Sequence, residues 1–364
     1  NDAGTWKTIK NLSVNNGTWR DVKSGWINVN GIWKEFYKKI QGKFIYLPAT
    51  SGNIIYFSDD GISWSSRTLP ATQTWRGLGY NSTSNAIVVV SPTNSAVSFD
   101  GGQTWSNGGA FYANAVTSDV CSGNGVLASV GGSPTPLCGA GAYSNNNGSS
   151  WAQTSLPTSS NACNYGSVTF GAGRFVAVST GRAASTTSTA AYSDDGINWA
   201  ASTMPYSQWY IQTRYYNNRF VAISYRVSST AGNDNGIAYS NNGINWTAST
   251  RPGYSTFALP QSMAFGNNRW IVLDSTMKAL YSDDNGQTFS LIPSTTTTSL
   301  YTGGTRAFAY GSGKFVIIVN NISTAGYSAT DQILTSTDGF TWISTPASFK
   351  TTGSGKLYFF ESLN

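Results

Sequence analysis

The chain has 364 residues, of which 10% are charged and 14% are aromatic, and its net charge is +6. Disordered segments contain few aromatic residues because they bury little apolar surface, so this composition excludes a disordered chain and predicts a folded, β-rich one. No apolar run approaches the roughly 20 residues that a membrane helix needs. We expect neither membrane insertion nor a signal peptide.

The sequence contains no histidine, which removes the commonest general base and the commonest metal ligand. Its three cysteines, Cys121, Cys138 and Cys163, lack the CxxC spacing of a zinc or thioredoxin-like site. We therefore predict no metal and no cofactor. Cys121 and Cys138 are close enough in sequence to meet across one sheet, and the alternative is three buried thiols, so their redox state stays open.

A short Trp motif recurs three times near the N-terminus, at Gly4–Lys7, Asn16–Arg20 and Asn30–Lys34. Asn-Gly is a strong signal for a two-residue hairpin turn, so residues 1–38 are predicted to form a small β-meander module. Residues 39–364 are assigned to a second, larger domain.

The basic excess is concentrated at the N-terminus, where the first 40 residues hold seven Lys or Arg and three acidic residues. A local excess of one charge favours docking to a partner. No basic run interleaves with aromatic residues as in a nucleic-acid-binding motif, so we expect no nucleic acid.

A turn signature recurs seven times in the larger domain, and its closing aromatic residues lie 41 to 53 positions apart. Each copy contains a Ser, an Asp or Asn, a Gly and an aromatic residue. Asp and Asn side chains accept hydrogen bonds from nearby amides, and Gly supplies the positive φ of a tight turn. The seven copies are Ser58–Trp64, Ser98–Trp105, Ser144–Trp151, Ser193–Trp199, Ser240–Trp246, Ser282–Phe289 and Ser336–Trp342.

A second signature precedes the turn in most repeats: a strand, a Gly or Asn turn, a basic residue and an apolar strand, as in Phe170–Val178. This pattern predicts a β-hairpin, so each repeat supplies four strands. A lone copy at Gly353–Phe360 lacks the Asp turn. We expect it to complete the first repeat and close a ring, although the strand that begins at Gly42 offers a similar Gly-Lys-aromatic pattern.

Residues 98–105 match the pattern Ser-x-Asp-x-Gly-x-Thr-Trp, and residues 282–289 match it with Phe for Trp. This signature resembles the Asp-box (bacterial neuraminidase) repeat. The resemblance implies an all-β fold, a seven-bladed β-propeller of four-stranded antiparallel blades. The Trp motif of residues 1–38 is similar to short Trp-rich β repeats of tailed-bacteriophage structural proteins.

The sialidases that share this repeat use an arginine triad, a Tyr–Glu pair and an acid/base Asp. The chain has two glutamates, Glu35 and Glu361, and we expect neither to reach a central cleft. Four aspartates outside the turns and the first module remain as candidate acids: Asp119, Asp234, Asp274 and Asp331. We predict a non-enzymatic protein.

Aromatic residues and arginines gather in the predicted connections between blades, where they suit the binding of sugars or proteins. The alternative is that they pack between blades. The candidate ligand-binding residues are Trp75, Tyr112, Trp209, Tyr210, Arg214, Tyr254 and Tyr301.

Three functional hypotheses follow. The leading one is an exterior bacteriophage virion protein, a tail-fibre or receptor-binding component. Residues 1–38 would then dock to tail or baseplate proteins, and the propeller loops would bind a host-surface glycan or protein. The alternatives are a secreted sialidase-like glycoside hydrolase and a cellular scaffold or assembly factor.

Overall fold

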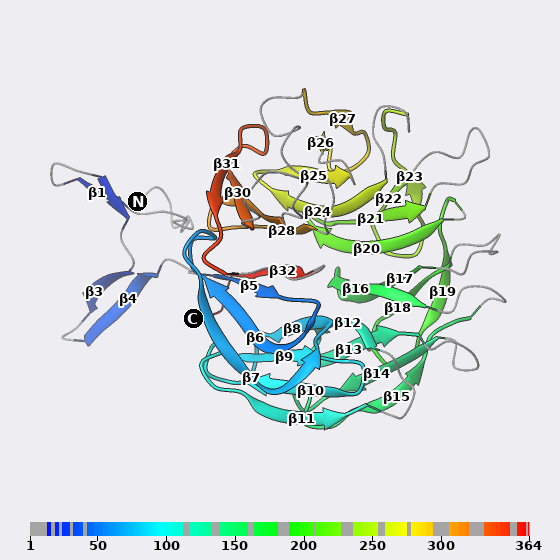
Figure 1. Ribbon diagram of the computed structural model, residues 1–364, viewed down its shortest axis with the longest axis horizontal. Helices are drawn as coiled ribbons and strands as arrows, with labels where there is room; N and C mark the ends of the chain where they lie inside the picture. Colours follow the sequence, from blue (N-terminus) through cyan, green and yellow to red (C-terminus); the bar gives the residue numbers. More distant parts are fainter. Residues whose placement is uncertain are drawn as a thin grey trace, which may run out of the picture.

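The computed structural model shows an all-β chain whose larger part is a ring of seven four-stranded antiparallel sheets (Figure 1). The structure describes residues 13–15, 19–21, 24–29, 32–38, 42–111, 117–132, 139–158, 164–180, 189–206, 208–226, 236–253, 259–274, 278–293, 306–319, 331–349, 355–361 and 363. Within these ranges no helix is long and apolar enough to cross a membrane. The predicted fold class is confirmed.

The N-terminal region contains two hairpins. Strand β1 (Ser13–Asn15) pairs with β2 (Trp19–Asp21), and β3 (Ser24–Val29) pairs with β4 (Ile32–Lys38). Both pairs are antiparallel.

Each blade runs from an innermost to an outermost strand in chain order, except the first. The bounds are β5 (Lys43–Leu47), β6 (Ser51–Ser58), β7 (Ser65–Thr74) and β32 (Lys356–Phe360) in blade 1; β8 (Gly77–Asn81), β9 (Ala86–Val90), β10 (Asn94–Ser98) and β11 (Ser106–Ala110) in blade 2; β12 (Thr117–Gly123), β13 (Val126–Gly131), β14 (Ala140–Ser144) and β15 (Ala152–Ser155) in blade 3; β16 (Tyr165–Gly171), β17 (Arg174–Ser179), β18 (Thr189–Ser193) and β19 (Ala200–Thr203) in blade 4; β20 (Trp209–Tyr216), β21 (Arg219–Arg226), β22 (Ile237–Ser240) and β23 (Thr247–Ala248) in blade 5; β24 (Pro260–Gly266), β25 (Arg269–Asp274), β26 (Ala279–Ser282) and β27 (Ser290–Leu291) in blade 6; and β28 (Arg306–Gly311), β29 (Lys314–Val319), β30 (Gln332–Ser336) and β31 (Ile343–Pro346) in blade 7.

The C-terminal strand closes the ring. Strand β32 is the innermost strand of blade 1 and pairs with β5, from Lys356 opposite Leu47 to Phe360 opposite Lys43. The expectation that the C-terminal copy completes the first blade is confirmed, and the strand after Gly42 is the second strand. Closure by β32 pairs the edge of β5 that would otherwise be open to another chain.

The repeated turn has the geometry that its residues predict. In the blade 2 copy, the Ser98 hydroxyl accepts the Gly102 amide at 2.9 Å, and Asp100 accepts the Thr104 amide at 2.9 Å and the Thr104 hydroxyl at 2.6 Å. Gly102 has φ of 86°, and the Trp105 indole donates to its carbonyl at 3.0 Å. The short side-chain acceptors thus replace backbone partners inside the turn.

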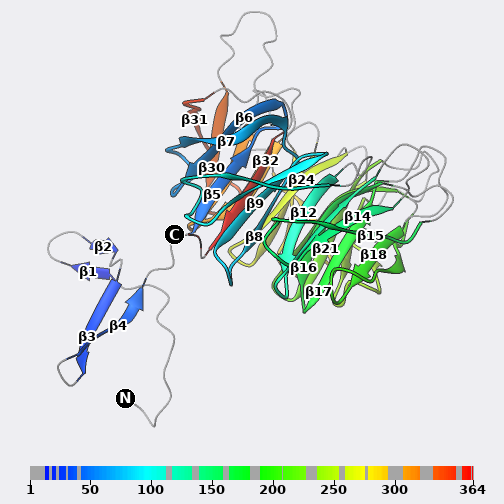
Figure 2. The same cartoon turned by 90° about the horizontal axis from the view of Figure 1, so that it is seen from below.

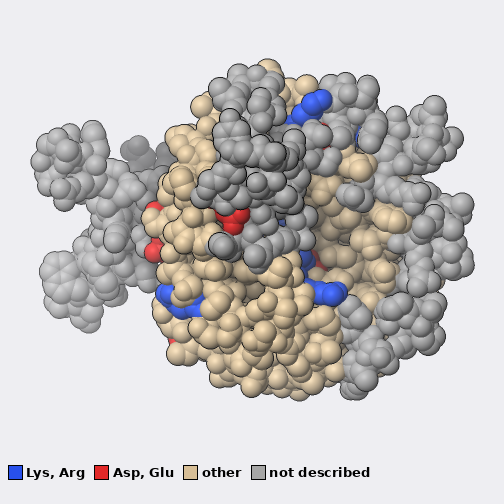
Figure 3. Space-filling view, in the orientation of Figure 1, with Lys and Arg blue, Asp and Glu red and all other residues tan. Residues whose placement is uncertain are grey.

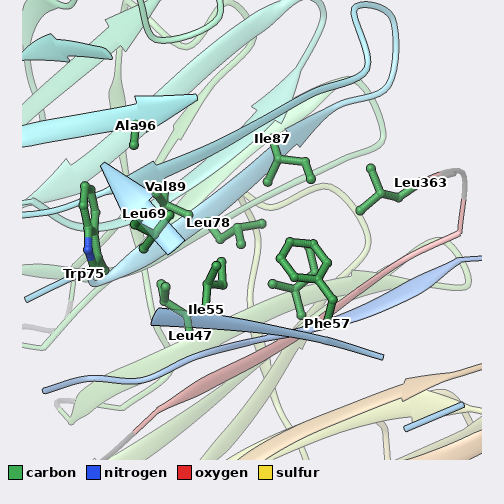
Figure 4. Packing of buried hydrophobic residues seen from close by; sticks show 11 residues of the cluster. Leu47, Ile55, Phe57, Leu69, Trp75, Leu78, Ile87, Val89, Ala96 and Leu363 are labelled. Carbon is green, nitrogen blue, oxygen red and sulfur yellow. The ribbon is translucent and has the colours of Figure 1, made fainter. Parts of the chain in front are cut away.

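Seven apolar clusters lie between the described parts of neighbouring blades, one at each interface. Strand β9 shows how one strand serves two of them: Ile87 and Val89 join the blade 1 interface, and Ala86, Val88 and Val90 join the blade 3 interface. Figure 4 shows the blade 1–2 cluster, in which side chains from the two blades point toward one another. Alternation along a strand buried on both faces explains its continuous apolar sequence.

Near the axis, an aromatic ring from one blade lies over a glycine of the preceding blade. A Cβ on Gly123 would lie 2.1 Å from the Phe170 ring, and Phe170 also packs on Phe175 with centroids 4.8 Å apart. The same arrangement recurs at Gly171 with Tyr215, Gly266 with Tyr310 and Gly311 with Phe359. These glycines allow the inner ends of the blades to approach closely.

The ring has two faces, which Figure 2 shows from its edge. We call one the Asp-box face, because the seven repeated turns and the hairpin turns that end the inner strands lie there. The loop face is the other, where the inner strands begin and the connections between blades arrive. The chain topology fixes this division, since each four-stranded blade must alternate its turns between the two faces.

Candidate functional site

The seven innermost strands β8, β12, β16, β20, β24, β28 and β32 surround a central channel. A cavity of 260 Å³ on the Asp-box side has lining residues from all seven strands. A second cavity of 250 Å³ opens toward the loop face. Both are lined by Asp119, Arg214, Phe308 and Leu357, so these four residues mark the waist where the two cavities meet.

A belt of polar side chains surrounds the waist. It is needed because each inner strand has one edge without a neighbouring strand. The amides on that edge need acceptors. Side chains at one equivalent position of neighbouring blades supply them across the blade interface, at 2.9 to 3.3 Å. The donor and acceptor pairs are Val168 with Asp119, Thr213 with Ser167, and Met263 with Gln212.

Asp119 is the most heavily engaged side chain of this belt. Its Oδ2 accepts the Val168 amide at 3.2 Å, and its Oδ1 lies 2.8 Å from the Nζ of Lys356. Lys356 also donates to the Ser118 carbonyl at 3.0 Å. The Asp119 side chain is 5% exposed, so its charge is neutralised within the protein rather than by water.

Arg214 stands opposite, on β20, and its only hydrogen bond within the described residues is from Nη1 to the Thr213 carbonyl at 3.1 Å. No described carboxylate forms an ion pair with it. The charge of Arg214 nevertheless acts across the channel. Burial raises the pKa of the Cys121 thiol and of the Tyr358 hydroxyl well above their ordinary values, Asp119 adds to the rise, and Arg214 opposes it.

The Asp-box end of the channel is aromatic. Tyr216 is 41% exposed and stacks on Phe265 with centroids 5.7 Å apart and planes 15° apart. Tyr358 and Phe360 stack at 6.1 Å with planes 7° apart. On the face shown in Figure 3, charged atoms of both signs lie in the hollow at the middle of the ring. The channel therefore offers flat apolar surfaces at one end and charged groups at its waist.

The structure places the seven predicted ligand-binding residues in different environments. Trp75 is 3% exposed, packs in the blade 1–2 core and donates to the Gly52 carbonyl at 3.1 Å, and Tyr210 is fully buried in the blade 4–5 core. Both rings fill interfaces between blades and neither is exposed in a loop, as expected under the alternative that these aromatic residues pack between blades. Trp209 is partly buried in β20, and Arg214 lies in the channel rather than in a connection. The remaining three lie outside the described residues: Tyr112, Tyr254 and Tyr301.

The candidate catalytic acids also lie in different environments. Asp119 is the only carboxylate among the described residues that line the two cavities. Asp274 is fully buried at the end of β25, where it accepts the Lys278 amide at 2.9 Å, and Asp234 lies outside the described residues. Glu361 directly follows Phe360, a lining residue of the Asp-box-side cavity, so it stands nearer the channel than expected.

Sequence reasoning missed Lys356, Tyr358 and Tyr216 as channel residues. A partial signal was available, since the inner strands of blades 4 to 7 are followed by a hairpin turn and a basic residue on the second strand. Counting back from the end of each inner strand, as its pairing with the second strand defines it, aligns Lys356 with Asp119, and Tyr358 with Arg214. The pairing of Asp119 with Lys356 could not be inferred this way, because it crosses between blades 1 and 3.

Comparison with known proteins supports the repeat and the fold. Residues 96–107 match the BNR/Asp-box repeat family. A structure of YCF48 bound to D1 peptide has a TM-score of 0.52 with 16% identity, and the match covers 85% of this chain and 95% of that one. YCF48 from Cyanidioschyzon merolae gives 0.48 with 13% identity over 81% and 95%, and the computationally designed Ika8 protein gives 0.47 with 11% over 86% and 91%. No curated protein matches by sequence. At these identities the first likeness concerns the fold alone.

Proposed function

We propose that this protein is a non-enzymatic binding propeller that holds a polypeptide partner at its central channel, in the manner of an assembly factor. The observation that carries the proposal is the state of Asp119. It is the one carboxylate on the described channel wall, and it is neutralised by Lys356 at 2.8 Å. The other side chains at the waist are suited to binding a ligand.

A sialidase-like site needs an arginine triad, a Tyr–Glu pair and an acid/base Asp, whereas the described residues that line the two cavities include one arginine, Arg214, and one carboxylate, Asp119. Asp119 is already engaged, since it accepts hydrogen bonds from the Lys356 ammonium and from the Val168 amide. A sialidase-like activity is therefore not proposed. Incubation of the full chain with a fluorogenic sialoside tests this point, and turnover that is lost in Asp119→Asn would contradict it.

A polypeptide is favoured as partner for two reasons. Arginine and aromatic side chains are the residues that most often anchor protein interfaces, and Arg214 and Tyr216 line the channel with Tyr358 and Phe360. In addition, the YCF48 structure contains a D1 peptide, so a ring of related architecture accommodates a peptide.

The test is binding of the full chain to a peptide array and to a glycan array. We expect saturable binding to a subset of peptides that weakens in Arg214→Gln. The matched control is Arg67→Gln, because Arg67 lies outside the channel over the Phe57 ring. Saturable binding to glycans without any peptide binding would overturn the proposal in favour of a glycan receptor.

A second candidate rests on residues 1–38, in which the recurring Trp motif accompanies two hairpins, β1–β2 and β3–β4. We propose as the alternative an exterior virion protein of a tailed phage, with this module docked to a tail or baseplate protein and the propeller directed at a host-surface glycan or protein. Co-sedimentation of the full chain with phage tails, abolished by removing residues 1–38, would support it. Absence of any association with tails would leave the assembly-factor proposal.

A further inference from the structure

The described residues that line the waist of the channel carry two positive charges and one negative charge. Within the described lining residues, Asp119 and Lys356 neutralise one another, and Arg214 is left without an anion. The guanidinium has five N–H donors, of which one group is engaged with the Thr213 carbonyl. Removing an ion from bulk water is unfavourable unless a counter-charge is supplied.

Arg214 is placed where a ligand can reach it from either face, because it lines both cavities. It belongs to β20, whose other side chains are held by the blade 4–5 and blade 5–6 interfaces, so its backbone is fixed. A donor on a rigid strand loses little freedom on binding, which favours specific recognition. A guanidinium fits the two oxygens of a carboxylate with two parallel hydrogen bonds.

A second donor stands at the same level. The Tyr358 hydroxyl lies 3.5 Å from Asp119 Oδ1 and therefore makes only a weak contact there. Burial, reinforced by the Asp119 charge, raises the pKa of this hydroxyl, which keeps it protonated and able to donate. The neighbouring Cys121 thiol is held neutral by the same causes, so no thiolate competes with an incoming anion.

The size and lining of the Asp-box-side cavity fix the rest of the ligand. Its 260 Å³ admits a small group rather than a folded segment, and Tyr216 and Phe265 present stacked faces at its mouth. Flat apolar surfaces of this kind suit an aromatic or apolar body.

We propose that the waist binds a carboxylate group, held by the Arg214 guanidinium and the Tyr358 hydroxyl, with its apolar or aromatic body against Tyr216 and Phe265. This deepens the proposed function and rests on it for the channel as binding site. The carboxylate has two sources of the same chemistry, the C-terminus of a polypeptide or a free organic acid.

The experiment measures calorimetric binding of matched probes to the full chain. One pair is a hexapeptide that ends in Phe, as the free acid and as the C-terminal amide. The other pair is phenylacetate and phenylacetamide. In each pair only the carboxylate changes. We expect an acid to bind about tenfold or more tightly than its amide, since a charge-assisted hydrogen bond is lost.

Three variants sharpen the result. Arg214→Gln is expected to abolish the difference between acid and amide, Tyr358→Phe to reduce it, and the control Arg67→Gln to leave it unchanged. If the peptide acid binds more tightly than phenylacetate, the carboxylate that the site recognises is the C-terminus of a polypeptide. If the two acids bind with equal affinity, it is a free organic acid. Equal binding of acid and amide, no binding of either acid, or an unaltered difference in Arg214→Gln would overturn the proposal.

Thermal unfolding separates binding from a structural role. If Arg214 serves a ligand, Arg214→Gln keeps or raises the melting temperature, because an unbalanced charge is removed. A lower melting temperature with unchanged acid binding would make Arg214 a structural residue. Peptide binding that does not depend on the carboxylate would overturn this inference and leave the proposed function standing. Binding of phenylacetate without binding of any peptide would overturn the proposed polypeptide partner and leave the carboxylate site standing.

Discussion

The Nζ of Lys356 lies 2.8 Å from Oδ1 of Asp119, which joins the strand that closes the ring to the inner strand two blades away. Lys356 belongs to β32, the last strand of the chain, and Asp119 to β12. The ion pair therefore links blade 1 to blade 3 and joins the closing strand to a blade with which it forms no sheet. The same two side chains contribute to ring closure and to the polarity of the channel.

Replacing Asp119 by Asn is expected to destabilise the fold by about 1–3 kcal/mol, because a charged hydrogen bond is lost and Lys356 keeps its charge. The Lys356 side chain is 35% exposed, so water limits the loss. Urea unfolding measures it, and a double-mutant cycle with Lys356→Met isolates the pair. The control cycle is Lys43 with Asp59, whose carboxylate is 70% exposed and which we expect to contribute at most about 1 kcal/mol. Equal coupling energies in the two cycles would contradict the assignment.

Removing residues 355–364 is expected to abolish cooperative unfolding. Without β32, the whole inner edge of β5 is unpaired and the apolar surfaces of Tyr46 and Phe44 lose their cover. Chemical unfolding and light scattering together check this, with aggregation as the expected outcome. Removing residues 1–38 is the comparison, and it should leave the transition of the ring intact.

Gly123→Ala is expected to destabilise the propeller by about 1–3 kcal/mol, since the new methyl group would overlap the Phe170 ring. Gly253→Ala provides the matched control, because nothing lies within 4 Å of a Cβ there and no positive φ is required. The difference between the two melting temperatures is the measurement. A neutral Gly123→Ala would show that the aromatic rings do not wedge the blades tightly.

Stability should fall at low pH through the repeated turns. Hydrogen bonds, above all from the Thr104 hydroxyl, lower the pKa of Asp100 from 3.8 to about 2. Because the pKa in the folded state lies below the ordinary value, folding favours the ionised form. This contribution is complete above about pH 4 and is lost as the pH falls toward 2.

The check is urea unfolding of the wild type and Asp100→Asn across that pH range. The variant reproduces the turn of blade 3, where Asn146 takes the place of the carboxylate and accepts the Ser150 amide at 3.0 Å. Its stability should change less between pH 4 and pH 2 than that of the wild type. Parallel profiles would show that this carboxylate does not contribute to the acid sensitivity.

The repeat, the turns and the blade number were predictable from the sequence, and the closing strand was narrowed to two candidates, one near each end of the chain. Each depends on short-range chemistry: the Asp, Gly and aromatic residues of one turn lie within eight positions of one another, as in Ser98–Trp105. The hairpin signature is equally local. Four strands per period leave a ring of blades as the arrangement that buries both faces of every sheet.

The candidate site was predicted only in part. Trp75 and Tyr210 have the composition of ligand anchors, but whether an aromatic residue beside a connection faces solvent or a neighbouring blade depends on which strand it begins or precedes. Arg214 was identified as a candidate, yet its position in the channel follows from the register of β20 rather than from its neighbours in the sequence. A shift of one residue in register would reverse its direction.

The sequence by itself determined the seven-bladed all-β architecture, because periodic local signals specify it. The tertiary structure alone decided that Asp119 meets Lys356 and that Arg214 has no ion-pair partner among the described carboxylates. Asp119 and Lys356 are separated by more than half of the chain, and no local preference couples them. Closure of the ring brings them together, since it converts seven separate strand edges into one channel.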